Sequence, residues 1–319
     1  MNCLVTGAAG FIGSNICQKL LSLGHQVIGI DSFLDYYPRK IKEANIYKIL
    51  SHENFRFIEA DINYLYLDNI FDGVNYIFHL AAQAGVRDSW GKDFSIYINS
   101  NIHVTQKLLE HCLHIKSLKK FIYASSSSIY GDTNIFPITE EAKMQPTSPY
   151  GASKLLGENL CYLYWKSYNL PVISLRFFTV FGPKQRPDMA FHKFIKAALN
   201  DQEIVIYGDG EQTRDFTYID DIVDANMLSM ESDINGEAFN IGGGARISLI
   251  KTIHLLQEII GKEIKIKYVE KQRGDMLHTY ANLTKAKSLL KYNPCVPIKN
   301  GLEKEVDWIK NNLKLLTNN

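Results

Sequence analysis

The stretch from Cys3 to Gly13 constrains the fold of this chain more than any other. Residues 3–5 are apolar and predict a short buried strand, and glycines follow at positions 7, 10 and 13. This spacing lets the backbone turn tightly and approach a pyrophosphate, and the start of the next helix supplies N–H donors and a positive dipole end. We therefore expect a strand, a turn and a helix start that bind a dinucleotide. The residues expected to contact it are Gly7, Gly10, Phe11, Ile12 and Gly13.

An acidic residue ends the second predicted strand. Residues 27–30 are apolar, and Asp31 follows them, 18 residues after Gly13. A carboxylate there accepts hydrogen bonds from a ribose 2′-hydroxyl and repels a 2′-phosphate. The sequence therefore predicts NAD rather than NADP. The alternative interpretation is a fortuitous glycine-rich turn and a surface aspartate.

Strand-like and helix-like patterns alternate through the first half of the chain. Further buried strands are predicted at 55–58, 76–80, 121–124 and 172–178. Helical periodicity is clearest at 14–23, 102–113 and 150–168. This alternation is typical of an α/β fold with a Rossmann-type, doubly wound parallel sheet. Further cofactor contacts are predicted near these elements, at Asp61, Ile62, Leu80, Ala81, Ala82, Asn101 and Phe177.

The pattern changes after about residue 180. Strands become shorter, and glycine-rich turns appear at 208–210 and 242–244. We expect a smaller C-terminal α/β lobe that closes over the carboxyl edge of the sheet, where such folds bind ligands. The predicted division is 1–178 for the NAD-binding domain, with returns near 215–245, and 179–319 for the substrate lobe. Residues 34–45, polar and aromatic, are expected to form a mobile loop near the cofactor.

Charge and cysteine usage argue against several classes of protein. The net charge is +1, and the five cysteines are scattered with no Cys-x-x-Cys pair, which favours a reducing compartment. There is no basic leader with a following apolar run and no apolar stretch of about 18 residues. We therefore expect a cytoplasmic protein without nucleic-acid or membrane partners. No metal site is predicted, because His111, Cys112 and His114 end a helix without a convincing fourth ligand.

Tyr150 and Lys154 form the candidate catalytic couple. Thr147 or Ser148 can cap a helix that Pro149 begins, and the spacing of four places both side chains on one helix face. A hydroxyl from the preceding serine run can bind a substrate hydroxyl. Tyr150 can then take its proton, provided that Lys154 and an oxidised nicotinamide lower a pKa of about 10. The alternative is a buried tyrosine beside a lysine on an amphipathic helix. The acidic pair Glu140-Glu141 is expected to be solvated.

Four motifs together resemble the extended short-chain dehydrogenase/reductase superfamily over the whole chain. They are Gly7-x-x-Gly10-x-x-Gly13, His79-Leu80-Ala81-Ala82, the serine run ending in Ile129-Tyr130-Gly131, and Tyr150-x-x-x-Lys154. Within that superfamily the chain is similar to the nucleotide-sugar 4-epimerases, whose substrate-lobe signature resembles residues 208–221. The resemblance implies Ser126 as the catalytic hydroxyl, Tyr150 as the base and Lys154 as its partner. It also implies that Ser127 and Ser128 bind the sugar.

Residues 176–191 resemble the UDP-glucuronate 4-epimerases closely. Thr179 stands where many relatives that act on neutral hexoses carry asparagine, and the segments 84–89 and 272–275 also resemble that subgroup. A uronate carboxylate requires hydroxyls and cations, and Thr179, Arg186, Arg87 and the serine run can supply them. Structural ion pairs or phosphate contacts are the alternative for both arginines. Further substrate contacts are proposed at Arg214 for the diphosphate, at Tyr207 and Met189 for uracil or core packing, and at Gln212 and the ambiguous Arg273.

The sequence therefore predicts NAD-dependent 4-epimerisation of UDP-glucuronate to UDP-galacturonate through a 4-keto sugar. A UDP-glucuronate decarboxylase shares the steps to the ketone, but such relatives usually carry asparagine at position 179. The sequence also leaves open a 4-epimerase of UDP-glucose, of UDP-N-acetylglucosamine or of its uronate, and a non-catalytic NAD-sensing regulator. By analogy with the superfamily, helices near 93–113 and 150–168 are expected to pair in a homodimer.

Overall fold

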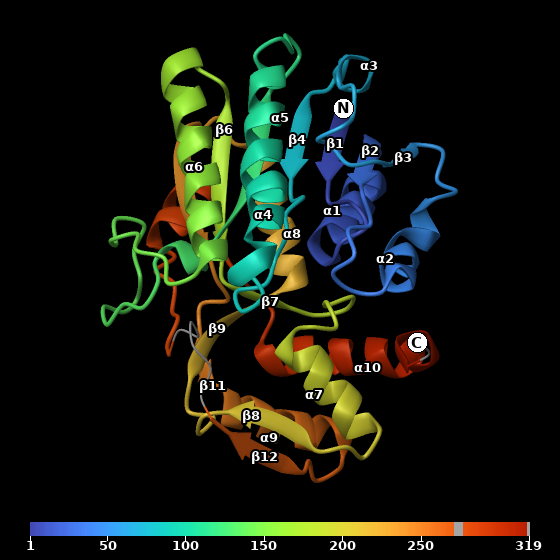
Figure 1. The fold of residues 1–319 in the computed structure, drawn as a ribbon, viewed down its shortest axis with the longest axis vertical. Helices are drawn as coiled ribbons and strands as arrows, with labels where there is room; N and C mark the ends of the chain where they lie inside the picture. The colour runs from blue at the N-terminus through green and yellow to red at the C-terminus, as the bar shows by residue number, and fades with distance from the viewer. Residues whose placement is uncertain (271–276, 318–319) are drawn as a thin grey trace.

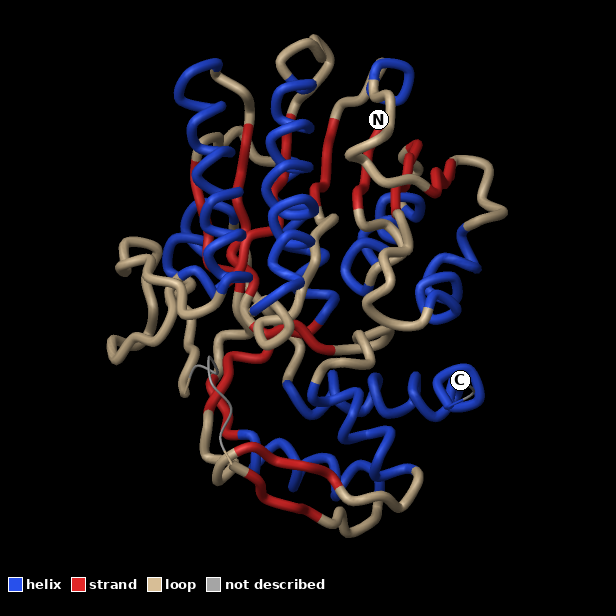
Figure 2. The backbone as a smooth tube through the Cα atoms, in the orientation of Figure 1, coloured by secondary structure: helices blue, strands red, loops and turns tan. Residues whose placement is uncertain are grey.

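The computed structural model describes residues 1–270 and 277–317, and its larger part is built on a seven-stranded parallel sheet (Figures 1 and 2). The strand order is β3-β2-β1-β4-β5-β6-β10, which confirms the predicted doubly wound sheet. The strands are β1 Asn2–Thr6, β2 Gln26–Asp31, β3 Phe55–Glu59, β4 Tyr76–His79, β5 Lys120–Ser126, β6 Val172–Phe177 and β10 Glu237–Ile241.

Both faces of the sheet are covered by helices because its strands carry apolar side chains on both sides. Leu4 and Phe121 pack in one buried cluster with residues of α5 and α6, whereas their neighbours Val5 and Ile122 pack in a second cluster with residues of α1 and α8. This alternation follows the two-residue period of a strand. The helices are α1 Phe11–Ser22, α5 Val104–Cys112, α6 Pro149–Tyr168 and α8 Ile219–Glu231.

Helix α6 begins where the sequence predicted. Ser148 is its N-cap, with Oγ accepting the Gly151 N–H at 3.1 Å, and Pro149 occupies the first turn. The cap satisfies an N–H group that has no partner within the helix. The helix ends at Asn169, whose φ of 57° lies in the left-handed region.

The helix over residues 94–112 contains a widened turn. It runs through α4 Phe94–Tyr97, a π-helical segment Ile98–His103 and then α5. Asn101 lies inside the π-helical segment. Its side chain accepts the Gln83 N–H at 2.7 Å and donates to Gln83 O and to Ser153 Oγ. The widened turn therefore aims this amide at the loop after β4 and at α6.

The expectation of a loop over residues 34–45 was wrong in its second half. Arg39–Ile46 form helix α2, followed by a 3₁₀ turn at Tyr47–Ile49. Ile41 and Ile46 are buried in the core, and Asn45 Nδ2 donates to Ala9 O of the glycine-rich turn at 3.0 Å. This helix is short and mostly polar, and it lacks a continuous apolar stripe. We infer that its few contacts with the rest of the protein stabilise it.

The smaller lobe begins immediately after β6. It contains a three-stranded sheet β11-β9-β7 and a two-stranded sheet β12-β8, seen below the main sheet in Figure 1. Its strands are β7 Thr179–Phe181, β8 Ile204–Tyr207, β9 Thr213–Tyr218, β11 Arg246–Ser248 and β12 Ile266–Val269. Its helices are α7 Ala190–Leu199, α9 Leu249–Ile260 and α10 Ile298–Thr317. The remaining short helical turns are α3 Asp68–Phe71, Gly91–Asp93, Ser127–Ile129 and Ala286–Leu290.

Glu140 and Glu141 do not form a solvated pair. Glu141 is exposed, but Glu140 is half-buried, and its carboxylate accepts the Asn240 N–H of β10 at 2.8 Å. Burial raises the pKa of Glu140, and hydrogen bonds from backbone amides oppose that rise. A long-range contact to the edge of the sheet therefore draws this acid inward.

A chain of buried hydrogen bonds joins β1 to the helix that carries Asn101. Thr6 Oγ1 accepts the N–H groups of Leu80 and Ala81, so its own hydrogen is left to donate to His79 Nδ1 at 2.8 Å. His79 Nε2 then donates to Thr105 Oγ1 at 2.9 Å, and Thr105 donates to Asn101 O at 2.6 Å. These directions require a neutral His79 that carries its hydrogen on Nε2. Burial, with the nearby charge of Lys154, lowers the pKa of His79 to about 3.

This buried histidine predicts a loss of stability in mild acid. Its pKa is about 3 in the folded chain and about 6.5 when unfolded, so below pH 6.5 the unfolded state binds the extra proton. The free energy of unfolding should fall by about 2 kcal/mol through this group between pH 7 and pH 5. Urea unfolding of the wild type and of His79→Gln at both pH values measures the difference.

Nitrogen NMR of labelled histidine provides the control for that prediction. His79 should remain neutral at pH 5, with hydrogen on Nε2. A charged ring at pH 5, or the same pH dependence of stability in His79→Gln, would contradict the assignment.

Candidate active site

The main cavity lies at the carboxyl edge of the sheet, between the sheet and the smaller lobe. Its volume is about 800 Å³, which is large enough for an extended organic ligand. It spans the ends of β1, β2, β4, β5 and β6, including the point where the order of the strands reverses. The predicted residues that line it are Gly7, Gly10, Phe11, Ile12, Gly13, Asp31, Asp61, Ile62, Leu80, Ala81, Ala82, Arg87, Ser126, Ser127, Ser128, Tyr150, Lys154, Phe177, Thr179, Arg186, Met189, Tyr207, Gln212 and Arg214.

One predicted residue is placed differently, and another lies outside the described residues. Asn101 is buried and does not line the cavity, because its amide is engaged by Gln83 and Ser153. We expected Asn101 to contact the cofactor, but in the structure its side chain lies between Gln83 and Ser153, outside the cavity lining. Arg273 lies outside the described residues, as does the segment 272–275 in which the sequence suggested a subgroup motif.

The glycine-rich turn has the geometry that a dinucleotide requires. Gly7 has a φ of +69°, and a Cβ there would lie 2.9 Å from Ala81 N. A Cβ on Gly13 would lie 2.1 Å from Gly7 O. Larger residues would therefore force apart β4, the turn and α1. Gly10 begins α1 without a side-chain cap, which suits a phosphate at the helix N-terminus.

Asp31 holds the same turn from the other side. Its Oδ2 accepts the Ala9 N–H at 3.0 Å, and its Oδ1 accepts the Phe33 N–H at 2.8 Å. Burial raises the pKa of Asp31, while hydrogen bonds from the amides of Phe33 and Ala9 and the charge of Lys42 oppose that rise. Each carboxylate oxygen keeps acceptor capacity, so the residue can also bind ribose hydroxyls at the cavity wall.

Tyr150 and Ser126 both line the cavity, and their side chains are hydrogen-bonded. Burial raises the pKa of the Tyr150 phenol, while a hydrogen bond with Ser126 and the charge of Arg186 oppose that rise. We expected Lys154 to lower this pKa. In the structure Lys154 Nζ instead donates to Ala124 O at 2.9 Å, and burial lowers the pKa of Lys154 to about 8. Arg186 of the smaller lobe is a cation whose charge acts on Tyr150.

The serine run turns sharply as it leaves β5. Ser126 Oγ accepts the Ser128 N–H at 3.1 Å and so caps the turn Ser127–Ile129. This turn brings Ser126, Ser127 and Ser128 to the cavity wall. Three hydroxyls at neighbouring positions can bind a polyhydroxylated ligand.

Arg186 is held by an ion pair, which was one alternative left open by the sequence. Its Nε and Nη2 donate to the Asp188 carboxylate at 2.9 and 2.8 Å. The guanidinium also lies over the Tyr36 ring, 5.7 Å from its centroid. Burial alone would raise the pKa of Asp188, but the hydrogen bonds and charge of Arg186 hold it below its usual range. Asp188 thus binds the Nε–Nη2 edge of the Arg186 guanidinium.

The sequence interpretation missed Tyr36 and Asp188. The Tyr36 hydroxyl lies 2.9 Å from Asp88 Oδ2 and 3.3 Å from Asp188 Oδ2. It thereby links the loop after β2 to the loop after β4 and to the segment before α7. Asp188 lies only two residues after Arg186, in a motif that the sequence analysis singled out. This spacing could have predicted the contact between the two side chains. Nothing local points to the partners of Tyr36.

Residues of the two parts face each other across the outer end of the cavity. The Arg87 guanidinium lies over the Tyr207 ring, 4.4 Å from its centroid. Gln212 Nε2 donates to Tyr207 O at 3.2 Å, and Arg214 Nη1 donates to Thr213 O and Leu277 O. This end of the cavity thus presents an aromatic ring, an amide and cations.

Two further properties concern the part of the chain that the structure describes. Within residues 1–270 and 277–317, no helix has both the length and the apolar character needed to span a bilayer. The same residues contain no cluster of three or more histidine, cysteine, aspartate or glutamate side chains placed to bind a metal ion.

Residues 3–242 match the model of the NAD dependent epimerase/dehydratase family. The chain is 43% identical to an uncharacterised UDP-glucose epimerase of Bacillus subtilis (strain 168), with 97% of this chain and 98% of the relative aligned. It is 40% identical to a UDP-glucuronate 4-epimerase of Thermodesulfobacterium geofontis, with 98% of this chain and 97% of the relative aligned.

A solved structure supports the same assignment. The chain is 46% identical to the UDP-glucuronic acid 4-epimerase of Bacillus cereus, crystallised with UDP-glucuronic acid and NAD. That match has a TM-score of 0.95 and covers 98% of this chain and 99% of that one. With the family model and these relatives aligned over nearly the whole chain, this protein belongs to the NAD dependent epimerase/dehydratase family.

Proposed function

We propose that this protein is an NAD-dependent 4-epimerase that interconverts UDP-glucuronate and UDP-galacturonate. The observation that carries the proposal is Arg186, a cation from the smaller lobe that lines the same cavity as Tyr150 and Ser126 and whose charge acts on Tyr150. A uronate presents its carboxylate beside the reacting carbon, and an arginine fork suits a carboxylate. The similarity to UDP-glucuronate 4-epimerases over nearly the whole chain supports the same substrate.

The residues divide into two groups along the cavity. The domain of residues 1–178, with returns near 215–245, binds NAD through its glycine-rich turn, Asp31 and the ends of β3 and β4. The lobe of residues 179–319 binds the nucleotide, with Tyr207, Met189 and Gln212 around the uracil. Arg214 of this lobe and Arg87 of the other domain hold the diphosphate. Ser127, Ser128, Thr179 and Arg186 hold the sugar ring between the two groups.

Tyr150 acts as base and acid in turn. It takes the proton of the C4 hydroxyl, which Ser126 orients, as the C4–H bond breaks and a C4 carbonyl forms. Bound NAD supplies the hydride acceptor for this step and the hydride donor for its reverse. After the 4-keto sugar turns over, C4 regains hydride on its opposite face and Tyr150 returns the proton. Lys154 lies one helical turn away and adds positive charge when protonated.

The intermediate is a β-keto acid, which loses CO₂ readily. Loss of CO₂ disperses the negative charge of the carboxylate, so a group that binds the charged carboxylate favours the ground state over that transition state. We assign this role to Arg186, Thr179 and the serine run. The same contacts would distinguish this enzyme from a UDP-glucuronate decarboxylase.

The helix over residues 94–112 (α4, the π-helical segment and α5) and helix α6 supply the dimer surface in this proposal. They pack beside each other on one side of the sheet (Figure 1) and carry exposed apolar side chains. These are Phe94, Ile98, Leu156, Tyr162 and Leu163. Pairing two such helices across a two-fold axis would bury these side chains in a four-helix contact.

Purified protein should convert UDP-glucuronate to a product of unchanged mass without added NAD. The reaction has no net redox change, so the cofactor is regenerated in place. Chromatography with mass detection resolves the products. A product lighter by CO₂ would identify a decarboxylase instead, and no product even with added NAD would refute the uronate assignment.

Tyr150→Phe is the matched control for that assay. It removes one hydroxyl, and the variant should stay folded but lose turnover. A protein that serves only as an NAD sensor would show no activity before the substitution and no change of cofactor binding after it.

Arg186→Leu should raise KM for UDP-glucuronate by roughly 10- to 100-fold. A hydrogen-bonded charge pair contributes about 1.5–3 kcal/mol. UDP-glucose lacks the carboxylate, so its KM should change far less, whereas loss of the Arg186 charge that acts on Tyr150 should lower kcat on both sugars. Steady-state kinetics on both sugars test this, with Arg39→Leu, a surface arginine outside the cavity, as control. An equal rise of KM for both sugars would contradict uronate recognition by Arg186.

The protein should have twice the mass of one chain in solution. Light scattering after size exclusion measures this, and Leu163→Glu on α6 should yield monomers. Tyr47→Glu places the same charge at another exposed apolar side chain and should leave the mass unchanged. A wild-type protein with the mass of one chain would refute the dimer.

A further inference from the structure

A buried ion pair lies between the catalytic helix α6 and the main sheet. Glu158 follows Tyr150 and Lys154 by two turns and one turn of α6, and it is 6% exposed. Arg176 lies in β6 and is 4% exposed. Neither side chain lines the cavity. Burying two charges usually costs more than their attraction returns, so a buried pair is weak evidence for stability. Its contacts therefore point to another role.

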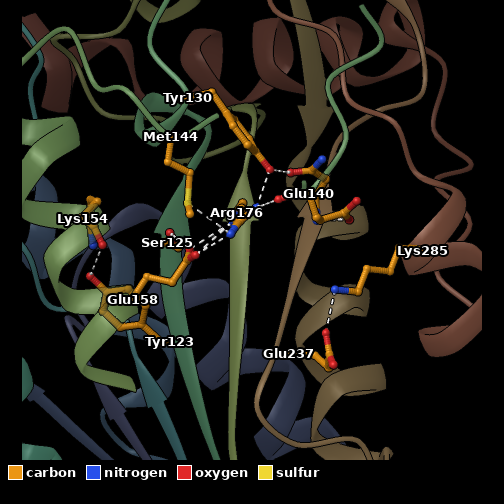
Figure 3. A network of polar contacts seen from close by, with 11 residues as sticks. Tyr123, Ser125, Tyr130, Glu140, Met144, Lys154, Glu158, Arg176, Glu237 and Lys285 are labelled. Carbon is orange, nitrogen blue, oxygen red and sulfur yellow. Dashed lines mark hydrogen bonds and ion pairs between the residues drawn. The ribbon is translucent and has the colours of Figure 1, made fainter. Parts of the chain in front are cut away.

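The Glu158 carboxylate joins the catalytic helix to the catalytic strand (Figure 3). Ser125 Oγ of β5 donates to Glu158 Oε2 at 2.6 Å, and Arg176 Nη2 donates to Glu158 Oε1 at 2.6 Å. Ser125 and Ser126 are consecutive in β5, so their side chains point to opposite faces of the strand. Ser125 also borders the cavity, but its hydroxyl is held by Glu158. Fixing Ser125 therefore fixes the strand position from which Ser126 faces the cavity.

The Arg176 guanidinium extends the same connection to the turn that follows. Its Nη1 donates to the Tyr130 hydroxyl at 2.7 Å and to Glu140 O at 2.9 Å. The Tyr130 hydroxyl donates to Asn240 Oδ1 at 2.7 Å. With Glu158 and the Met144 sulfur as further acceptors, all five N–H donors have partners. The turn that carries Ser127 and Ser128 is thus held at its end, and the network reaches β10.

We propose that Glu158 and Arg176 are positioning residues that set the placement of Ser126 relative to Tyr150. Both catalytic side chains project from elements that this pair joins from behind. Misplacement of about 1 Å can cost about 100-fold in rate, whereas binding of the nucleotide depends on residues at the far end of the cavity. The inference rests on the proposed epimerase function for its kinetic consequence.

Ser125→Ala is the sharpest test because it removes one hydrogen bond and leaves the ion pair intact. We expect kcat to fall about 10-fold with KM changed less than about 2-fold, because geometry and not binding is disturbed. Ser125→Thr keeps the oxygen and should recover most of kcat. Ser229→Ala is the control: it also removes a buried serine hydroxyl, which donates to Ala225 O within α8, remote from the site.

Amide hydrogen exchange measures, without any substrate, how firmly the segments that carry Ser126 and Tyr150 are held in place. In Ser125→Ala the amides of residues 127–130 and 150–154 should exchange faster than in the wild type, and those of α8 should not. Equal kcat and equal exchange in Ser125→Ala and Ser229→Ala would overturn the proposal, as would a change confined to KM. If the wild type turns over no uridine diphosphate sugar, the proposed function fails, and the exchange rates alone decide the positioning role.

Discussion

The active site depends on the close approach of three backbone segments at the carboxyl edge of the sheet. The turn at Gly7, the loop after β4 at Ala81 and the first turn of α1 at Gly13 leave no room for side chains between them. Because they meet directly, the N–H groups at the start of α1 face the cavity instead of a neighbouring side chain. Asp31 and Asn45 then hold the turn through Ala9, one at its N–H and the other at its carbonyl.

Polar contacts behind the cavity connect its two halves. Lys184 comes from the segment that carries Arg186, and its Nζ donates to Asn45 O of α2 at 2.9 Å. Asn45 in turn contacts the glycine-rich turn, so the segment that carries Arg186 is tied to that turn. The chain from Thr6 through His79 to Asn101 makes a similar connection on the other side of the sheet, since Asn101 reaches α6 through Ser153.

The sequence was most informative where the backbone imposes a requirement. Glycines at fixed spacing, an acid at a strand end and a Tyr-Lys pair with a capped helix start each leave a local pattern, and the structure brings these residues to one cavity. The contacts of Tyr36 with Asp188, 152 residues away, have no local pattern. Helix α2 was missed because it is mostly polar. The inward position of Glu140 depends on β10, which lies 100 residues later in the chain.

Residues 98–103 form a π-helical segment within the helix that runs from 94 to 112. The position of the Asn101 amide therefore depends on the number of residues in this helix as well as on their types. Each residue of an α-helix advances by about 100°, and a π-helical turn holds one residue more than an α-helical turn between hydrogen-bonded groups. Deleting one residue here would close the turn and rotate the preceding helix by about that angle relative to α5. The Asn101 amide would then leave Gln83 and Ser153. Among homologous chains, this stretch should therefore accept exchanges of residue type more readily than insertions or deletions.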